Sequence, residues 1–323
     1  MVVESGNFNF STEDSSRTNL SANDSVRDTL VSKEQSELSR TGHTVVAVFL
    51  GVIFLLGFLS NLFVLLVFAR FQVLRTPINL ILLNISVSDM LVCIFGTPFS
   101  FAASLYGRWL IGAHGCKWYG FANSLFGIVS LVSLAILSYE RYSTILCYTK
   151  ADTSDYKKAW LAIAGAWLYS LVWTVPPFFG WGSYGPEGPG TMCSVQWHQR
   201  SSRNISYVTC LFIFCLLLPL LLMIFCYGKI LFAIHGNVLS PQVAKINQSS
   251  AQRRETHVLL MVVSMVSCYL LCWMPYGVVA LLATFGQVGL VSPTTSIVPS
   301  ILAKSSTFLN PIIYGLLNNQ VTA

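Results

Sequence analysis

The sequence has very little charge for its length. Only 10% of its 323 residues are Asp, Glu, Lys or Arg, whereas 54% are hydrophobic, and the formal net charge is +6. A water-soluble domain carries about 25% charged residues, so the composition excludes an ordinary soluble globular protein. Acids are the scarcest charged group. Only six follow residue 43, and they are Asp89, Glu140, Asp152, Asp155, Glu187 and Glu255.

The first 42 residues have few large apolar side chains and are rich in Ser, Asn, Thr and acids. Such a segment cannot bury enough apolar surface to offset the entropy of ordering, so we expect residues 1–42 to form a disordered tail. A basic-then-apolar start is missing, which argues against a cleaved signal peptide. Three N-x-Ser motifs begin at Asn9, Asn19 and Asn23. They predict N-glycosylation if the tail faces the secretory lumen.

Seven long apolar stretches follow the tail. A bilayer core of about 30 Å needs roughly 20 mostly apolar residues per helix, and the ten-residue alternation of barrel strands is absent. The stretches occupy residues 44–69, 78–105, 116–147, 158–179, 204–233, 255–285 and 292–317. We therefore expect an all-α membrane protein, with a seven-transmembrane helix bundle over residues 43–317. Lys and Arg concentrate in the loops that an extracellular N-terminus would place in the cytoplasm, in agreement with the positive-inside rule.

The loops between these stretches are short. The longest cytoplasmic loop, residues 234–254, leaves no room for an appended catalytic domain. We see no internal repeat of the kind that builds many transporters. We therefore expect a protein that is not an enzyme, and in which any chemistry occurs inside the bundle or is passed to a partner.

A few polar residues stand at membrane depth, where they are costly and usually functional. Asn61, Asp89 and Asn310 lie inside the first, second and seventh stretches. They predict either a polar network that fixes helix packing or an ion-binding site, and a network of this kind can do both.

Lys304 is the least expected residue of the seventh stretch, which contains no acid. A charged ammonium at this depth costs several kcal/mol unless it is paired or neutralised. The side chain either snorkels to a membrane interface about two turns away or stays inside as a desolvated amine. Desolvation is the usual preparation of a lysine for Schiff-base formation with an aldehyde. The sequence leaves both alternatives open.

Two of the nine cysteines stand apart from the others. Seven lie in or at the ends of apolar stretches and behave as small apolar residues. Cys116 opens the third stretch on the outer side, and Cys193 lies in the outer loop between the fourth and fifth stretches. An oxidising compartment allows a disulfide there. Such a bridge would hold the loop, with Glu187, over the bundle as a lid.

Three motifs occur together with the seven stretches. Glu140-Arg141-Tyr142 ends the third stretch, Cys272-Trp273-Met274-Pro275 lies in the sixth, and Asn310-Pro311-Ile312-Ile313-Tyr314 lies in the seventh. Over residues 44–320 this combination resembles a rhodopsin-class G-protein-coupled receptor. Lys304, six residues before Asn310, matches the retinal-binding lysine of opsins. The segments RTPINLILLNISVSDMLV, SLFGIVSLVSLAILSYERY and CWMPY are similar to the teleost multiple-tissue opsin and encephalopsin group.

The resemblance implies a cofactor and the residues that hold it. Lys304 would carry retinal, 11-cis or all-trans, as a Schiff base, and the lid disulfide would join Cys116 to Cys193. Amine receptors place an Asp seven residues after the first of these cysteines, where this sequence has Asn123. The residues expected to line the retinal pocket are Lys304, Glu187, Trp273, Tyr276, Tyr269, Tyr119, Gly127, Ser124, Phe212 and Trp197.

One departure from vertebrate visual opsins concerns charge. They keep a carboxylate one helical turn after the cysteine that matches Cys116, and Tyr119 stands there in this sequence. Tyrosine is neutral at pH 7, so Glu187 becomes the candidate counterion, and it aligns with a loop carboxylate of many non-visual opsins. At about 4 Å and an effective dielectric of about 20, it would contribute roughly 4 kcal/mol. Asp89 is the second candidate.

The same resemblance implies a light-driven switch. Light would convert retinal from 11-cis to all-trans, and a changed bundle conformation would activate a heterotrimeric G protein of the Gi/Go class. A loop counterion further implies a bistable photoproduct that keeps its retinal. The residues expected to couple or switch are Glu140, Arg141, Tyr142, Glu255, Asn310, Pro311 and Tyr314, with Asn61 and Asp89 in the polar network.

We therefore expect a plasma-membrane protein with an extracellular N-terminus, a G protein and arrestin as partners, and neither nucleic acid nor metal ions. Residues 318–323 carry neither an amphipathic eighth helix nor a Ser/Thr-rich tail, so we interpret them as a truncated end, from a fragment or a splice form. Two alternatives stay open. One is a retinal photoisomerase with the same fold and lysine, and the other is a light-independent receptor or scaffold in which Lys304 is unused.

Overall fold

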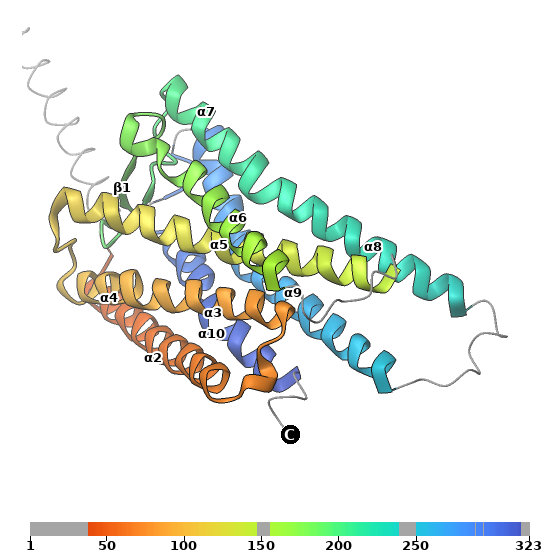
Figure 1. Ribbon diagram of the computed structural model, residues 1–323. Helices are drawn as coiled ribbons and strands as arrows, with labels where there is room; N and C mark the ends of the chain where they lie inside the picture. Colours follow the sequence, from red (N-terminus) through yellow and green to blue (C-terminus); the bar gives the residue numbers. More distant parts are fainter. Residues whose placement is uncertain (1–37, 147–155, 239–249, 288, 293, 318–323) are drawn as a thin grey trace, which may run out of the picture.

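The computed structural model describes residues 38–146, 156–238, 250–287, 289–292 and 294–317. Within these ranges the chain forms seven helical segments, and they lie side by side (Figure 1). In chain order they are α2 (Arg40–Arg70), α3 (Pro77–Phe95) with α4 (Thr97–Tyr106), α5 (Gly112–Leu146), α6 (Tyr156–Thr174), α7 (Ser202–Cys210) leading into α8 (Leu218–Val238), α9 (Ser250–Phe285) and α10 (Ile297–Leu317). These segments confirm the expected all-α bundle.

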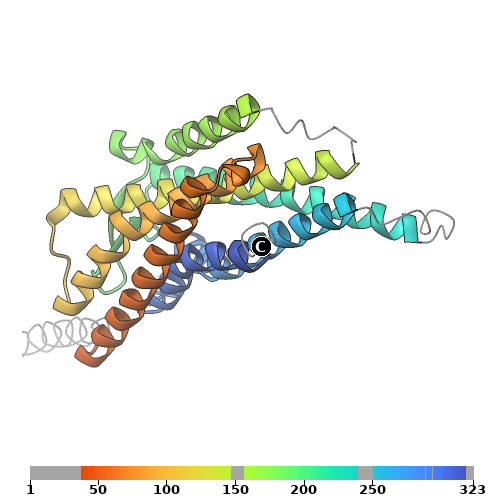
Figure 2. The same cartoon turned by 60° about the horizontal axis from the view of Figure 1, so that its bottom comes forward.

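The most buried of the long helices, α5, runs through the middle of the bundle in two orientations of the molecule (Figures 1 and 2). It packs against α3, α6, α8 and α9. One chain of side-chain hydrogen bonds ties three of these helices together. Trp167 Nε1 donates to Asn84 Oδ1 at 2.8 Å, and Asn84 Nδ2 donates to Ser133 Oγ at 2.9 Å. Interhelical bonds of this kind fix helix packing where lipid supplies no hydrophobic drive.

Six helical segments in the described part of the chain are long and apolar enough to cross a membrane. The seventh, α10, is less apolar because it carries Lys304, Asn310 and a run of hydroxyl residues among its 21 residues. Pro275 and Pro311 lie inside α9 and α10, as expected. The same helix that has these polar residues also carries Lys304 into the bundle.

The second expected stretch is two helices rather than one. α3 ends at Phe95, Gly96 separates the two, and α4 begins at Thr97 and ends at Tyr106, directly before Gly107. Pro98, in the first turn of α4, has no backbone N–H to continue the hydrogen-bond ladder of α3. Gly107 has a φ of 67°, in the left-handed region that favours glycine. This break separates α3 from α4, and α4 packs mainly against α2.

The fifth expected stretch is also interrupted. Between α7 and α8, Leu211–Leu217 adopts the wider π-helical turn, which frequently marks a functional position. Pro219 follows directly, and proline disturbs the carbonyls one turn before it. The hydroxyl of Tyr169, on α6, donates to the carbonyl of Phe214 at 2.7 Å. A carbonyl of the π-helical turn is thus hydrogen-bonded by a side chain of α6. Leu211 and Cys215, in the same turn, are buried inside the bundle.

A short hairpin covers the outer end of the bundle. β1 (Tyr184–Glu187) pairs antiparallel with β2 (Met192–Val195). Gly188 and Gly190 have φ values of 62° and 79° in the turn between them. A disulfide joins Cys193 of β2 to Cys116 at the start of α5, with the Cα atoms 5.5 Å apart. The expected pairing is confirmed, and the hairpin is held against α5 as a lid.

Candidate functional site

A cavity of about 200 Å³ lies beneath the lid, between α5, the π-helical turn, α9 and α10. Since one water molecule needs roughly 10–15 Å³ of such space, this cavity has room for a much larger molecule. All ten residues expected around the chromophore line it, and they are Lys304, Glu187, Trp273, Tyr276, Tyr269, Tyr119, Gly127, Ser124, Phe212 and Trp197. The structure therefore gathers, from α5, α9, α10, the lid and the turn after α7, side chains that are up to 185 positions apart (Tyr119 to Lys304).

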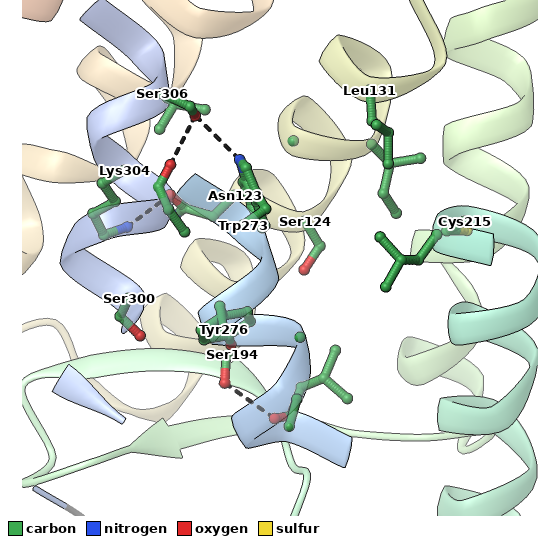
Figure 3. A pocket seen from close by; sticks show the side chains of 18 of the residues that line it. Asn123, Ser124, Leu131, Ser194, Cys215, Trp273, Tyr276, Ser300, Lys304 and Ser306 are labelled. Carbon is green, nitrogen blue, oxygen red and sulfur yellow. Dashed lines mark hydrogen bonds between the residues drawn. The ribbon is translucent and has the colours of Figure 1, made fainter. Parts of the chain in front are cut away.

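Lys304 enters the cavity from α10 (Figure 3). Its Nζ donates a hydrogen bond to Oδ1 of Asn123, on α5, at 3.2 Å. The same nitrogen lies 5.2 Å from the ring centroid of Tyr119, within the range of a cation–π contact. The amine is therefore directed into the bundle, and the snorkelling alternative is not what the structure adopts.

Glu187, at the end of β1, is the acid that the lid contributes to the cavity. Its Oε2 accepts a hydrogen bond from the hydroxyl of Tyr276 at 3.3 Å. Burial raises the pKa of Glu187 to about 7, although hydrogen bonds from Ser194 and Tyr276 and the positive charge of Lys304 act to lower it. The carboxyl is thus partly ionised at neutral pH, and it responds electrostatically to charge on the lysine.

Tyr276 is oriented by two partners. Trp197 Nε1, from the segment that follows the lid, donates to the Tyr276 hydroxyl at 3.0 Å. Because that hydroxyl accepts from Trp197, its single proton is available for Glu187. The Tyr276 hydroxyl, on α9, therefore connects Trp197 to the Glu187 carboxyl by two consecutive hydrogen bonds.

Trp273 forms the inner wall of the cavity. Its indole Nε1 donates to Ser306 Oγ on α10 at 3.1 Å, and its ring stacks on Tyr269 with centroids 5.6 Å apart. A Cβ on Gly127 would come within 3.0 Å of the Trp273 ring. The glycine therefore allows a large aromatic plane to lie directly against α5.

The end of the cavity away from Lys304 is apolar. Figure 3 shows Leu131 and Cys215 on the opposite side of the space from the lysine. Leu211, Phe212 and Ile128 also line the cavity. One end thus offers an amine with a nearby carboxyl, and the other offers aliphatic and aromatic surface. This donor set fits a long apolar molecule that has a carbonyl carbon at one end.

Comparison with known proteins agrees with this geometry. The family model of the seven-transmembrane receptors of the rhodopsin family matches residues 60–314. Opsin-3 of Mus musculus is 40% identical over 87% of this chain and 70% of its own length, and pinopsin of Columba livia is 37% identical over 85% and 78%. The crystal structure of squid rhodopsin superimposes with a TM-score of 0.82 and 29% identity, covering 88% of this chain and 85% of that one.

The chain belongs to the opsins, within the rhodopsin receptor family. Family membership makes this opsin a multi-pass membrane protein and a receptor rather than an enzyme. It also implies a retinal chromophore and coupling to a heterotrimeric G protein in general terms. The roles of the individual residues around the cavity stay predictions.

The opsin has a second polar cluster at the inner end of the cavity. Asp89 lines the cavity floor, and its Oδ2 accepts a hydrogen bond from Asn310 Nδ2 at 3.0 Å. Asn61 Nδ2 donates to the backbone carbonyl of Thr307 at 2.7 Å and to that of Gly57 at 2.8 Å. These bonds link α2, α3 and α10, as the packing alternative for the three polar residues predicts.

Several of the expected switch residues of the opsin lie toward the ends of α5 and α10 that are far from the lid. Arg141 is buried near the end of α5, and the ring of Tyr314 lies 5.8 Å from that of Phe68. Pro311 is buried in α10, and Glu140 and Tyr142 flank Arg141 on α5. The side chain of Glu255 and the whole of Asn9, Asn19 and Asn23 lie outside the described residues. The coupling and glycosylation roles therefore stay predictions.

Two residues with a clear structural role were not expected from the sequence, one in the cavity and one beside the lid. Asn123 was noted only as the replacement of an amine receptor's Asp, yet it is the direct partner of Lys304. Its spacing could have revealed it, because residues 119, 123 and 127 recur every fourth position and so share one face of a helix. Asn204 is buried at the start of α7 and donates to the carbonyls of Gln196 and Gln199. It anchors the chain that leaves the lid.

Proposed function

We propose that this opsin is a non-visual photoreceptor in which Lys304 holds retinal as a protonated Schiff base and Glu187 supplies the counter-charge. The observation that carries the proposal is the Lys304 amine inside an apolar cavity that a disulfide-held lid covers. When bound, retinal would supply the light-driven change from the 11-cis to the all-trans isomer.

The cavity supports the covalent attachment in three ways. The Lys304 Nζ has a fixed direction because it bonds Asn123. The lid and the aromatic walls exclude water, which protects an imine from hydrolysis. Leu211, Phe212 and Ile128 offer an apolar lining to a hydrophobic chain. Each of these side chains acts before any light is absorbed, so they set the resting state.

Glu187 supports the charged form of the Schiff base. Its carboxyl lies in a desolvated position in which a nearby positive charge favours ionisation. The positive charge of a protonated Schiff base on Lys304 would favour the ionised form of Glu187 by the same attraction. The lid thereby contributes the carboxylate that vertebrate visual opsins keep at the position of Tyr119.

Trp273 and its neighbours support a route from the cavity to the cytoplasmic side. The Trp273 indole bonds Ser306 on α10, and α10 bonds Asp89 on α3 through Asn310. We propose that a changed cavity shape is relayed along this path to Arg141 and Tyr314. A Gi/Go-class G protein, later binding of arrestin, an extracellular N-terminus and a plasma-membrane location complete the proposal.

The test is a spectrum. Purified opsin in detergent is mixed with 11-cis retinal in the dark, and a visible absorption band is expected that Lys304→Ala abolishes. Light-dependent nucleotide exchange on a purified Gi or Go protein then tests the signalling step. If no band develops with the unmodified protein, the light-independent receptor is the better account.

The same preparation tests bistability and the isomerase alternative. After illumination, a bistable pigment keeps its retinal and returns to its first spectrum with a second wavelength. A photoisomerase would instead take up all-trans retinal and release the 11-cis isomer, with no nucleotide exchange. Chromatography of the extracted isomers separates the two.

A further inference from the structure

The hydrogen-bond partner of Lys304 is a neutral amide rather than a carboxylate. Nζ lies 3.2 Å from Asn123 Oδ1, while the nearest acid of the lid, Glu187, accepts from the Tyr276 hydroxyl. The other acid that lines the cavity, Asp89, accepts from Asn310. Charge balance and direct hydrogen bonding at the amine are therefore assigned to different residues.

The amide of Asn123 is held in one orientation. Its Nδ2 donates to the backbone carbonyl of Tyr119, one turn earlier on α5, at 2.8 Å. Rotating the amide by 180° would place its NH2 group against the ammonium and its oxygen against a carbonyl, and both contacts would be repulsive. The oxygen therefore faces Lys304 for a reason internal to the helix.

Space for this oxygen comes from the break between α3 and α4. A Cβ on Gly96 would lie only 2.3 Å from Asn123 Oδ1. Any larger residue at position 96 would force the amide to move. Gly96 thus leaves the space in which the amide oxygen of Asn123 points at the Lys304 amine.

We propose that Asn123 is a positioning residue that accepts the single N–H of the protonated Schiff base and fixes its direction in the cavity. The inference rests on the function proposed above. An ammonium has three N–H donors, whereas a protonated imine has one, so after attachment one acceptor determines where the N–H points. Asn123 acts by hydrogen bonding, and Glu187 acts by charge.

Three variants separate the two roles. Asn123→Leu removes the acceptor but keeps the approximate volume, Glu187→Gln removes the charge but keeps the acceptor, and Asn123→Asp in the Glu187→Gln background restores a charge at the acceptor position. Each is reconstituted with 11-cis retinal. The readouts are the absorption spectrum against pH and the C=N stretching frequency in H2O and D2O by resonance Raman spectroscopy, since the deuterium shift reports the strength of the N–H hydrogen bond.

Asn123→Leu should reduce the deuterium shift and move the visible-to-ultraviolet transition to a pH about one unit lower, because a charge-assisted hydrogen bond is worth at least about tenfold in the equilibrium. Glu187→Gln should abolish the visible band at neutral pH while leaving the deuterium shift, measured at acidic pH, unchanged. The double variant Glu187→Gln with Asn123→Asp should regain the visible band.

Outcomes for the two proposals are distinguishable. A wild-type protein that forms no pigment overturns the proposed function. A wild-type pigment with an Asn123→Leu variant of unchanged deuterium shift and unchanged transition overturns the role of Asn123 alone. If Asn123→Leu fails to fold, the double variant decides, and its failure to regain the band lost in Glu187→Gln overturns the inference.

Discussion

Two carboxyl groups of the same cavity are held in different ways. Glu187 sits in the lid, which a disulfide fixes to α5, and it accepts a hydrogen bond from a tyrosine hydroxyl. Asp89 sits in the middle of α3, is only 2% exposed, and accepts from an asparagine amide of α10. Because the disulfide holds the lid, Glu187 stays over the cavity, where it interacts electrostatically with Lys304. Asp89 is instead held by its hydrogen bond from Asn310, between α3 and α10. The position of each acid in the fold supports the proposed counterion role of Glu187 and a packing role for Asp89.

Removing the disulfide should have the largest effect on this comparison. In the double variant Cys116→Ser with Cys193→Ser, the lid loses its covalent attachment, so Glu187 is no longer held over the cavity, while Asp89 keeps its partner. We expect no stable visible band with 11-cis retinal and a loss of about 2–5 kcal/mol in the free energy of unfolding. Thermal unfolding and the absorption spectrum measure both, with the free cysteine variant Cys210→Ser as the control. A variant with a normal spectrum would show that the lid holds itself in place.

Replacing each of the two acids by its amide tests which of them acts as the counterion. In Glu187→Gln, the protonated Schiff base loses the attraction of the lid carboxylate, so the visible band should move to the near ultraviolet at pH 7. In Asp89→Asn, the band should stay visible, because the change lies in the α3 and α10 network. Spectra between pH 5 and pH 9 make the comparison. A pigment that loses its visible band in Asp89→Asn but keeps it in Glu187→Gln would reverse the assignment.

Much of this fold could be predicted from the sequence because the bilayer imposes one length and one composition on each helix. The seven stretches, the two helix-internal prolines and the disulfide pair were all expected. The break at Gly96 and the π-helical turn before Pro219 were not, because each depends on how a few backbone carbonyls find partners in neighbouring helices. Hydropathy averages over about twenty residues, and such local changes have no signature in it.

The site shows the same limit at the level of single side chains. Lys304, Trp273 and Tyr276 could be predicted because each belongs to a short motif or matches a known position. For Asn123, the spacing of residues 119, 123 and 127 could have placed it on the cavity face of its helix, but nothing in the sequence relates it to residue 304, so the contact itself could not be predicted. The amide orientation of Asn123 depends on its own helix, and the space for it depends on a glycine of another helix. Contacts of this kind follow only from the assembled bundle.

The pH dependence of stability tests the lid acid by itself. Burial raises the pKa of Glu187 from 4.5 to about 7 in the folded protein, so the folded state retains a proton that the unfolded state has lost. Stability from this group is therefore full below about pH 4.5 and is lost as the pH rises through 7, by at most roughly 3 kcal/mol. The melting temperature of the chromophore-free opsin should fall between pH 5 and pH 8, and the fall should be smaller in Glu187→Gln. Equal slopes in the two proteins would contradict the raised pKa.

The smallest expected effect, on the Schiff-base hydrogen bond, comes from a pair of glycine variants. They test the lysine end of the cavity without changing either acid. In Gly96→Ala, the new Cβ would lie 2.3 Å from Asn123 Oδ1 and 2.7 Å from the Val92 carbonyl oxygen, so the amide must move away from Lys304. Such overpacking costs about 1–3 kcal/mol, and the Schiff-base deuterium shift should decrease as in Asn123→Leu. The matched control is Gly165→Ala on α6, where an added Cβ meets nothing within 4 Å. That variant should keep both the wild-type stability, within about 0.5 kcal/mol, and the wild-type deuterium shift. Because Gly96→Ala leaves both carboxyl groups and the Asn123 side chain in the protein, a reduced shift in it alone would mean that the direction of one amide oxygen, and not charge, determines the hydrogen bond at the imine.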